Sequence, residues 1–592
     1  MIPTDKDSLM RHTMTRRTTP PSARRTALIT ACAVIAAAGG TAAALTTPAG
    51  AAAAGCTVDY KVTNQWSTGF GAAVTVTNTG DPVNGWKLEW SYAGGQRVTQ
   101  GWNAEITQAG AAVTAKNVSY NGTLATGAST GFGFNASYSG SNALPTAFKL
   151  NGVTCNAGPT DPTDPTDPPD PTDPPGGRVD NPYAGAKVYV NPEWSAKAAA
   201  EPGGSRIAGQ PTGVWLDRTA AVAGGNGTMG LRAHLDEALR QKGAGELVVQ
   251  LVIYNLPGRD CAALASNGEL GPTEIDAYKT QYINPIAAIL GDPKYAGLRI
   301  VTTVEIDSLP NLVTNVTPRA TATPNCDTMK ANGNYIKGVG YALNKLGAVP
   351  TVYNYVDAGH HGWLGWDDNF GASAELFKQA ATAEGSSLAK VHGFIVNTAN
   401  YSALKEDHFT IDDSVNGTSV RQSKWVDWNR YTDELSYAQA MRAKLVSLGF
   451  DSGLGMLIDT SRNGWGGTAR PSAPGARTSV DTFVDGGRYD RRIHLGNWCN
   501  QAGAGLGERP RSAPAAGIDA YVWMKPPGES DGSSKAIPND EGKGFDRMCD
   551  PTYTGNPRNN NNMSGALGNA PVSGHWFSAQ FQELMKNAHP AL

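Results

Sequence analysis

Charged side chains are scarce in this sequence: Asp, Glu, Lys and Arg make up 17% of its 592 residues, and the formal net charge is −3. No basic cluster occurs beyond the N-terminus, which argues against nucleic acid or a strongly charged ligand as the partner. Gly (70) and Trp (14) are plentiful instead. Such a surface suits a neutral, hydroxyl-rich partner.

Long apolar runs are also lacking, except for Ala27–Ala44 near the start of the chain. Arginines precede this run, the last being the pair Arg24 and Arg25, and the small-residue stretch TPAGAAAAG follows it. The pattern predicts a secretory signal peptide over residues 1–54, and hence a secreted, extracellular protein. A retained membrane anchor is the alternative. No later segment is long enough to span a bilayer, so we expect no membrane partner.

Cysteines are few, and none stands in a CxxC pair, which argues against a zinc site. We therefore expect no metal, and nothing in the sequence calls for a cofactor. One of the seven, Cys32, lies in the predicted signal peptide. The even number that remains suggests disulfides in an exported chain. These six are Cys56, Cys155, Cys261, Cys326, Cys499 and Cys549.

Residues 55–156 alternate between apolar and polar side chains, as in GFGAAVTVTNTG and GWKLEWSYAG, with Gly, Asn and Thr turns between the runs. This pattern predicts an all-β sandwich. Trp86 and Trp90 alternate with an apolar neighbour and are expected in its core. A disulfide between Cys56 and Cys155 would close a loop in the unfolded chain, and the chain-entropy model sets the resulting stabilisation of the fold at roughly 4.7 kcal/mol at most.

Three aromatic residues of this unit lie in turn-like or Gly-rich surroundings: Trp66, Trp102 and Tyr120. Plain packing is one interpretation; exposed rings that stack on the apolar faces of sugars are the other. The pattern NQWSTGF…GWKLEW…VTQGWNAE…GFGFNASYSG…PTAFKLNGVTC resembles a family 2 carbohydrate-binding module. The resemblance implies that the three rings bind crystalline cellulose. Tyr120 departs from the family pattern, where Trp is usual.

Residues 157–177 repeat Pro-Thr-Asp. Proline fixes φ and disfavours a helix before it, so this segment is expected to be a semi-rigid polyproline II linker. Its aspartates form a solvated charge run rather than a metal site.

Residues 178–592 are expected to form one large domain in which seven strand-like runs alternate with helix-like runs. This order favours an α/β fold, a distorted seven-stranded parallel β/α barrel. An open doubly wound sheet would need a Gly-rich loop after its first strand, and none is there. The strand-like runs are Lys187–Val190, Leu247–Tyr254, Arg299–Ile306, Pro350–Val356, His392–Asn397, Gly453–Asp459 and Ala520–Met524. The helix-like runs include Leu231–Gln241, Thr273–Leu290, Asn334–Leu346, Ala372–Ala383 and Glu434–Leu448.

Carboxylates recur where these strands end, beginning with Glu305 and Asp307 in VTTVEIDSLPN. Other strands run into Asp260, Asp357 and Asp531. If the strands are parallel, these acids lie together at the carboxyl-terminal end of the barrel, which is where barrel enzymes have their active sites. Several indoles share these segments. Acids beside aromatic platforms are what glycosidic bond cleavage requires.

The same segments resemble glycoside hydrolase family 6, the inverting cellulases, over most of residues 180–592. The resemblance implies that Asp307 is the general acid and that Asp260 raises its pKa and positions water. Asp531 corresponds to the candidate base, Tyr254 to a tyrosine that distorts the sugar, and Ser266 to a serine that guides water.

The remaining site residues are expected to bind substrate. They come from the strand ends and from the resemblance: Trp194, Arg259, Asp357, His360, Trp363, Trp366, Asn397, Trp498, Lys525 and Glu529. Asp357 alternatively supports the fold. The resemblance also implies disulfides that join Cys261 to Cys326 and Cys499 to Cys549.

Long loops, Cys261–Thr273 and the tract from Lys525 to Pro551, can roof the site, which favours an exo-acting cellobiohydrolase working from non-reducing ends. The alternatives are an endoglucanase of the same family and a non-catalytic cellulose-binding protein. Inversion predicts an acid and a base about 6.5–9.5 Å apart. The expected partner is a β-1,4-glucan chain, and the expected state is a monomer.

Overall fold

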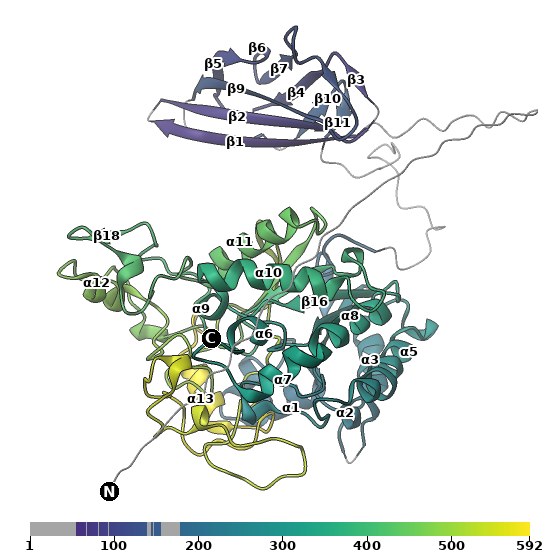
Figure 1. Ribbon diagram of the computed structural model, residues 1–592, viewed down its shortest axis with the longest axis vertical. Coiled ribbons are helices and arrows are strands. Elements are labelled where there is room, and N and C mark those ends of the chain that lie inside the picture. Colours follow the sequence, from purple (N-terminus) through teal and green to yellow (C-terminus); the bar gives the residue numbers. More distant parts are fainter. Residues whose placement is uncertain are drawn as a thin grey trace, which may run out of the picture. The chain divides into compact units, whose positions relative to one another are not determined.

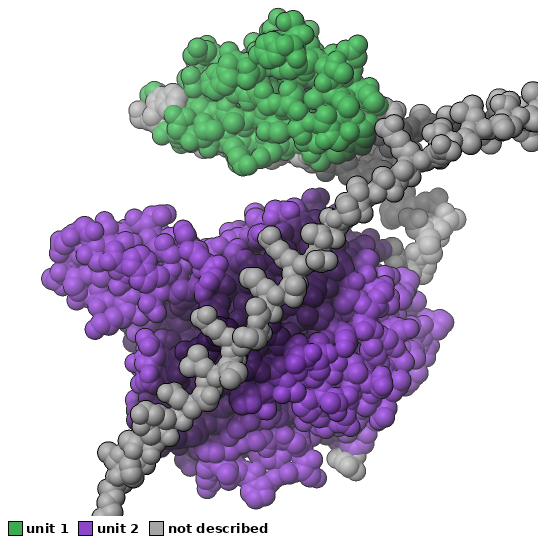
Figure 2. Space-filling view, in the orientation of Figure 1, with its two compact units in different colours: residues 1–169 green, residues 170–592 purple. Residues whose placement is uncertain are grey.

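The computed structural model describes residues 55–155 and 178–592, apart from residues 67, 81, 93, 139–141, 143, 146 and 226 and the side chains of Trp66 and Thr154. The predicted signal peptide and linker lie outside the described residues. The chain divides into two compact units, residues 1–169 and 170–592 (Figure 2). In the described ranges, no helix has the length and apolar character needed to cross a membrane.

The first unit is the expected β-sandwich (Figure 1). Its strands pair antiparallel, and side chains of each sheet alternate between the core and solvent. One sheet has the order β1 (Cys56–Trp66), β2 (Gly69–Asn78), β9 (Ser129–Ser137), β5 (Arg97–Trp102). The other has the order β11 (Val153–Thr154), β10 (Phe148–Leu150), β4 (Lys87–Ser91), β7 (Ala112–Lys116), β6 (Glu105–Ala109), while β3 (Val83–Asn84) pairs with β8 (Thr123–Leu124).

Aromatic side chains fill the space between the two sheets. Trp86 stacks on Phe132 at 5.7 Å between ring centroids, and Trp90 stacks on Phe134 at 5.9 Å. Both tryptophans are buried, so the prediction that they belong to the core is confirmed. The predicted bridge between Cys56 and Cys155 is present and ties the two ends of the unit together.

The second unit is built on one parallel sheet, and all seven predicted strands are found in it. Two further strands, β13 and β21, were not predicted; β21 is antiparallel to its neighbour. The order is β12 (Ala186–Val188), β14 (Glu246–Ile253), β15 (Arg299–Val304), β16 (Val352–Asp357), β17 (Gly393–Val396), β20 (Gly455–Asp459), β22 (Ile518–Val522), β21 (Arg511–Ala515), with β13 (Val214–Leu216) also on β14.

This sheet curls until its two sides approach each other. The amide N–H of Gly213, just before β13, donates to the carbonyl of Trp523, just after β22, at 3.0 Å. The indole N–H of Trp215 donates to the carbonyl of Met524 at 2.9 Å. No strand ladder crosses this seam in the described part of the chain. The predicted distorted barrel is therefore confirmed as a curled sheet that is only partly closed.

Continuous apolar strands bury both faces of the sheet. In β14, Val249 and Leu251 pack outward against helices, whereas Val248 and Val252 point into the barrel. The outer helices touch one another in succession and surround the sheet (Figure 1). They are α3 (Leu231–Lys242), α4 with a π-helical turn and α5 (Ile275–Leu290), α8 (Asn334–Leu346), α10 (Asp367–Ala381) and α11 (Glu434–Ser447). All five predicted helices are thereby found.

Shorter elements complete the second unit. A lobe that carries β18 (Ser414–Val415), β19 (Thr418–Ser419) and α12 (Val480–Gly487) projects to one side (Figure 1). The other helices are α1 (Pro192–Ala200), α2 (Thr219–Ala223), α6 (Asn311–Thr314), α7 (Pro324–Asn332), α9 (His361–Leu364) and α13 (Ser578–Lys586). Disulfides join Cys261 to Cys326 and Cys499 to Cys549, as the resemblance implied.

Candidate active site

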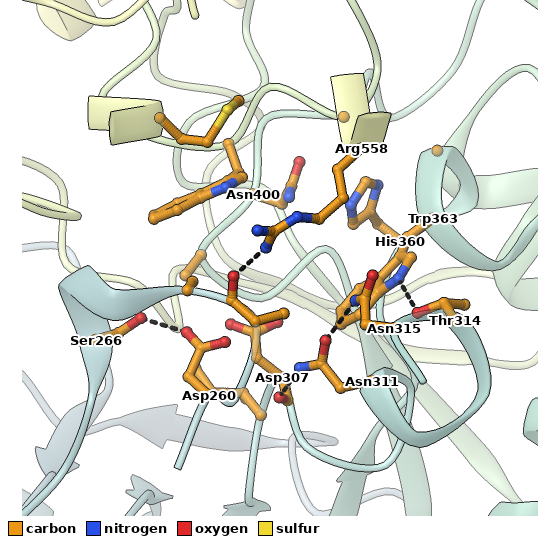
Figure 3. A pocket seen from close by; sticks show the side chains of 18 of the residues that line it. Asp260, Ser266, Asp307, Asn311, Thr314, Asn315, His360, Trp363, Asn400 and Arg558 are labelled. Carbon is orange, nitrogen blue, oxygen red and sulfur yellow. Dashed lines mark hydrogen bonds between the residues drawn. The ribbon is translucent and has the colours of Figure 1, made fainter. Parts of the chain in front are cut away.

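A cavity of about 440 Å³ opens at the carboxyl ends of the parallel strands (Figure 3). Ten of the predicted site residues line it, although they come from segments up to 277 positions apart, from 254 to 531. They are Tyr254, Asp260, Ser266, Asp307, His360, Trp363, Trp366, Trp498, Lys525 and Asp531. The expectation that parallel strands would bring these groups to one mouth is confirmed.

The acids that follow β14 and β15 have an unusual backbone. Asp260, Glu305 and Asp307 have φ values of 51°, 52° and 53°. Non-glycine residues rarely adopt this left-handed conformation, and it concentrates at functional sites because the surrounding structure must impose it. The turns after both strands therefore hold these carboxylates in defined directions.

Asp307 is half-buried, and its carboxyl faces the cavity (Figure 3). Burial raises its pKa well above the usual range, and the nearby carboxylates of Asp260, Asp357 and Asp531 raise it further. The Asp307 backbone is held in place, because its N–H donates to the Asp357 carboxylate at 3.2 Å and its carbonyl accepts from the Asn311 amide at 2.6 Å. A carboxyl held protonated at neutral pH can donate a proton.

Asp260 lies across from Asp307 and is 5% exposed. Burial raises its pKa to about 7; the hydrogen bond from the Ser266 hydroxyl and the charge of Arg259 act in the opposite direction. Two neighbouring acids with raised pKa values release their protons as a pair, in two steps. Between those steps the pair holds one proton, so one carboxyl can act as an acid while the other is a carboxylate.

Asp531 differs because its oxygens are already occupied. They accept from the Arg462 guanidinium at 2.7 and 2.9 Å, from the Tyr401 hydroxyl at 2.6 Å and from the backbone N–H of Asn500 at 2.8 Å. Arg462 is fully buried, so this ion pair is shielded from solvent. Asp531 is thus held in a fixed position on the cavity wall, and a water molecule would have to compete for its lone pairs.

Glu305, which shares the strand end with Asp307, does not line the cavity. Its carboxylate accepts from the Tyr278 hydroxyl at 2.8 Å and from the backbone N–H groups of Asn255 and Leu256 at 3.2 Å. Burial raises its pKa to about 7. Tyr278 begins the π-helical turn Tyr278–Ile283. Glu305 therefore fastens the end of β15 to the end of β14, which holds the turns that follow both strands.

Two indoles form an aromatic wall. The N–H of Trp363 donates to the Thr314 hydroxyl at 2.8 Å, and that of Trp366 donates to the Asp427 carbonyl at 2.7 Å. Because each ring is anchored by its polar edge, a face remains for a ligand. His360 also lines the cavity, with its imidazole 3.2 Å from a serine hydroxyl.

Three of the predicted substrate-binding residues do not line the cavity, because their side chains are buried in contacts within the fold. Trp194 is 1% exposed, packs edge-on against Trp523 and donates to a backbone carbonyl. Arg259 is 2% exposed and donates to four backbone carbonyls. Asn397 is 1% exposed and donates to the Asp459 carbonyl.

Asp357 and Glu529 also lie outside the cavity lining. Asp357 is 3% exposed and supports the Asp307 backbone, which is the fold-supporting role left open for it. Glu529 is half-buried and forms an antiparallel bridge with Trp576.

Sequence reasoning missed Trp215, Asn400 and Arg558, which all line the cavity. Trp215 lies in the three-residue strand β13, which is too short for a periodicity signal. Arg558 comes from the asparagine-rich segment GNPRNNNN, where no spacing indicates a site. Its guanidinium reaches across to the Ala262 carbonyl (Figure 3).

The two loops expected to roof the site are joined to each other. Gly544 N–H donates to the Leu264 carbonyl at 2.9 Å, and Leu264 N–H donates to the Asp546 carboxylate at 2.9 Å. Each loop also contributes lining residues, among them Ser266 and Met548. The cavity is therefore bounded on one side by a continuous pair of loops.

Ion pairs fasten the second loop to the segment after β13. Lys543 lies 3.3 Å from Asp217 and 2.9 Å from Glu541, and Arg218 lies 3.1 Å from Glu541. The Lys543 side chain is only 4% exposed, so solvent screens these pairs less than it screens surface pairs.

On the β-sandwich, Trp102 is 46% exposed and Tyr120 is 74% exposed. The Trp102 indole lies over Gly133, its partner on β9, where an added Cβ would come within 2.5 Å of the ring. Tyr120 is oriented by a 2.8 Å hydrogen bond from its hydroxyl to Asn103. The side chain of Trp66, the third predicted ring, lies outside what the structure describes.

Two family models match the chain. The model described as glycosyl hydrolases family 6 matches residues 179–588, and the model described as a cellulose binding domain matches residues 56–155. The two matches fall on the curled-sheet unit and on the β-sandwich, respectively.

Individual relatives agree with this assignment. Exoglucanase A of Cellulomonas fimi is 50% identical over 436 residues, covering 70% of this chain; the chain spans about half (49%) of that relative. A probable 1,4-beta-D-glucan cellobiohydrolase C of Aspergillus fumigatus is 35% identical, with 69% of this chain and 78% of the relative covered. The solved catalytic domain of Cellulomonas fimi Cel6B is 49% identical, with a TM-score of 0.67 over 70% of this chain and 97% of that domain.

Proposed function

Because the chain belongs to glycosyl hydrolases family 6 over residues 179–588, we propose that it hydrolyses the β-1,4-glucosidic bonds of cellulose with inversion and releases cellobiose from non-reducing chain ends. The observation that carries this proposal is the pair Asp307 and Asp260, two acids with raised pKa values at the ends of adjacent strands in one indole-walled cavity. We also propose that the chain is secreted and that the β-sandwich holds it on its insoluble substrate.

In the first part of the mechanism, Asp307 protonates the glycosidic oxygen while the bond from that oxygen to the anomeric carbon breaks. A developing positive charge on the sugar ring is stabilised by the carboxylates around it. Asp531 contributes its carboxylate here, and Arg462 and its other donors hold that carboxylate in place.

In the second part, water attacks the anomeric carbon from the opposite face, which inverts its configuration. Ser266 and Asp260 are suitably placed to orient this water, because they are hydrogen-bonded to each other on the cavity wall. The proton lost by the water passes to Asp260, or through further water to Asp531, the candidate base. That carboxyl then passes the proton back to Asp307, directly or through water, which restores the starting protonation of both groups.

The exo mode is supported by the joined loops above the site. A polymer cannot easily enter sideways beneath segments that are hydrogen-bonded to each other and fastened by ion pairs, so it must thread in by an end. The fully open cleft of an endoglucanase would leave those loops apart. The names exoglucanase and cellobiohydrolase among the relatives favour the same choice.

The proposal is tested by measuring soluble sugar from amorphous cellulose with wild type, Asp307→Asn and the exposed-acid control Asp485→Asn. We expect the first variant to lose about a hundred- to ten-thousandfold in kcat, which is the typical contribution of general acid catalysis, and the control to match wild type. Equal release by Asp307→Asn would remove this residue from the mechanism.

Two further readouts separate the alternatives. Viscosity loss without much soluble sugar would favour an endoglucanase, and binding to cellulose without any sugar release would favour a non-catalytic cellulose-binding protein. NMR of fresh product should show the α anomer, because inversion of a β bond produces it; the β anomer would contradict the acid and base assignment.

A further inference from the structure

An exposed indole stands outside the cavity lining. Trp428 is 56% exposed, which makes it the most exposed large hydrophobic side chain among the described residues of 178–592. It belongs to the segment between β19 and α11. Single exposed hydrophobic residues are common and by themselves mean little, so the surroundings of this one decide its meaning.

The backbone at Trp428 is held in a costly conformation. Asp427 and Trp428 have φ values of 46° and 67°, in the left-handed region that a bulky side chain rarely adopts. Arg421 fixes this turn: its carbonyl accepts from the Trp428 N–H at 2.6 Å, and its guanidinium donates to the carbonyls of Trp428 and Asn429. The turn therefore presents the indole in a defined direction rather than as a loose loop tip.

The same turn is fastened to the segment that carries the cavity's aromatic wall. The Asp427 carbonyl accepts from the Trp366 indole at 2.7 Å. The Asn429 side chain donates to the His361 carbonyl at 2.9 Å. The Arg430 N–H donates to the Gly365 carbonyl at 3.1 Å.

An ion pair between Arg430 and Asp367 adds a contact at the start of α10, at 2.7 Å. Asp367 and the next residue are exposed, whereas the preceding Trp366 lines the cavity. The chain therefore passes from the cavity lining to solvent between Trp366 and Asp367. Trp428 directly follows the residue whose carbonyl anchors the Trp366 ring, so the turn that carries this exposed indole contacts the aromatic wall of the cavity.

We propose that Trp428 is a further sugar-binding platform, which holds the part of a β-1,4-glucan chain that extends out of the cavity beyond Trp366. A pyranose ring offers apolar C–H faces to an indole, and successive rings of one chain would stack on Trp363, Trp366 and then Trp428. This inference rests on the proposed function, because it assigns a ligand to the continuation of the same binding surface.

The platform would act only on chains long enough to reach it. A short substrate that fits within the cavity does not contact Trp428 and binds no more tightly because of it. A polymer binds more tightly, because one more of its sugar rings stacks on an indole. An aromatic contact of this kind is worth about a factor of ten in binding, or ~1.4 kcal/mol. The expected signature is a defect that depends on substrate length.

The experiment uses the full chain with Trp428→Asn and Trp428→Tyr. Asn removes the ring but tolerates the left-handed backbone, so the turn should survive; Tyr keeps an aromatic face. Met563→Ala is the matched control, because it removes another exposed apolar side chain (42% exposed) from the same unit. Thermal melting of all variants checks that each is folded.

We expect Trp428→Asn to leave kcat/KM on cellotetraose within about twofold of wild type and to lower the rate on amorphous cellulose by about tenfold, with the effect mainly in KM. Trp428→Tyr should retain most of the rate, and Met563→Ala all of it. Equal losses on both substrates would mean that Trp428 only supports the loop, and no loss on either would mean that no sugar touches it. Either result overturns the inference.

Failure of this inference and failure of the proposed function give different results. If the wild type releases no sugar from either substrate, the proposed function is wrong. If the wild type is active and Asp307→Asn is inactive while Trp428→Asn shows no length dependence, the proposed function stands and only the platform is refuted.

Discussion

The exposed ring of Trp102 depends on a glycine beneath it, and this gives a sharp prediction. In β9, Gly133 pairs directly with Trp102 in β5, and a Cβ added at position 133 would come 2.5–2.7 Å from three atoms of the indole. No carbon atom can occupy that space while the ring stays where it is. Gly133→Ala must therefore push the indole off the sheet.

The expected loss of binding follows from the area of the Trp102 indole that a sugar surface can cover. A tryptophan side chain offers up to about 250 Å², and 46% of Trp102 is exposed, which leaves on the order of 100 Å² for a sugar surface. At about 25 cal/mol per Å², covering it is worth roughly 2–3 kcal/mol. Displacing the ring should weaken adsorption to crystalline cellulose by about 10- to 100-fold.

The assay is a depletion isotherm of the full chain on microcrystalline cellulose. Gly131→Ala is the matched control: it lies two residues away on the same face of β9, and its new methyl group would meet nothing closer than a carbonyl oxygen at 3.8 Å. Trp102→Ala sets the size of a complete loss. If Gly133→Ala binds as tightly as Gly131→Ala, the flat position of the ring does not matter for binding, and the reasoning fails.

Three other outcomes are expected. Asp260→Asn removes a like charge that raises the pKa of Asp307, so the alkaline limb of the kcat/KM profile should move to lower pH; an unchanged limb would show that burial and the other carboxylates set that pKa without Asp260. Tyr278→Phe removes a donor that lowers the pKa of the buried Glu305, which is about 7. This carboxyl is charged above that pH, so the variant should lose more stability at pH 8 than at pH 5, by about 1–3 kcal/mol. Thermal melts at the two pH values measure the loss, and equal losses would contradict the hydrogen bond from Tyr278 to a charged Glu305. Lys543→Ala breaks the ion pairs that fasten the roof, so the ratio of viscosity loss to soluble sugar should rise, and a constant ratio would show that the loops stay joined without them.

The local pattern of the sequence was enough to predict the fold class of both units and, in the second unit, the main strands and the outer helices. Period-two alternation indicated the β-sandwich, and its cysteines at either end form the predicted bridge. The seven buried strands were visible as short runs of Val, Ile and Leu. The strands β13 and β21 were missed because one is three residues long and the other contains mixed small and polar residues, so neither carries a periodic signal.

Which polar residues reach the cavity was decided by the tertiary structure. Trp194, Arg259 and Asn397 lie near strand ends or helix starts, yet they are buried because backbone carbonyls from distant segments accept their hydrogen bonds. Conversely, Trp215 and Arg558 reach the site only because the sheet curls and a late loop folds back over it.

The sequence alone determined the chemical types at the site, since acids that directly follow strands are placed by the strand ends themselves. Their ionisation was decided by the folded chain, because a raised pKa requires burial and a like charge brought close from another strand, as at Asp307 and Asp260. The pair of loops that bounds one side of the cavity likewise depends on segments about 280 residues apart, at Leu264 and Gly544, that meet only in three dimensions. Short-range patterns determine whether a segment forms a strand, a helix or a turn, whereas the contacts of its side chains depend on which distant segments the fold brings beside it.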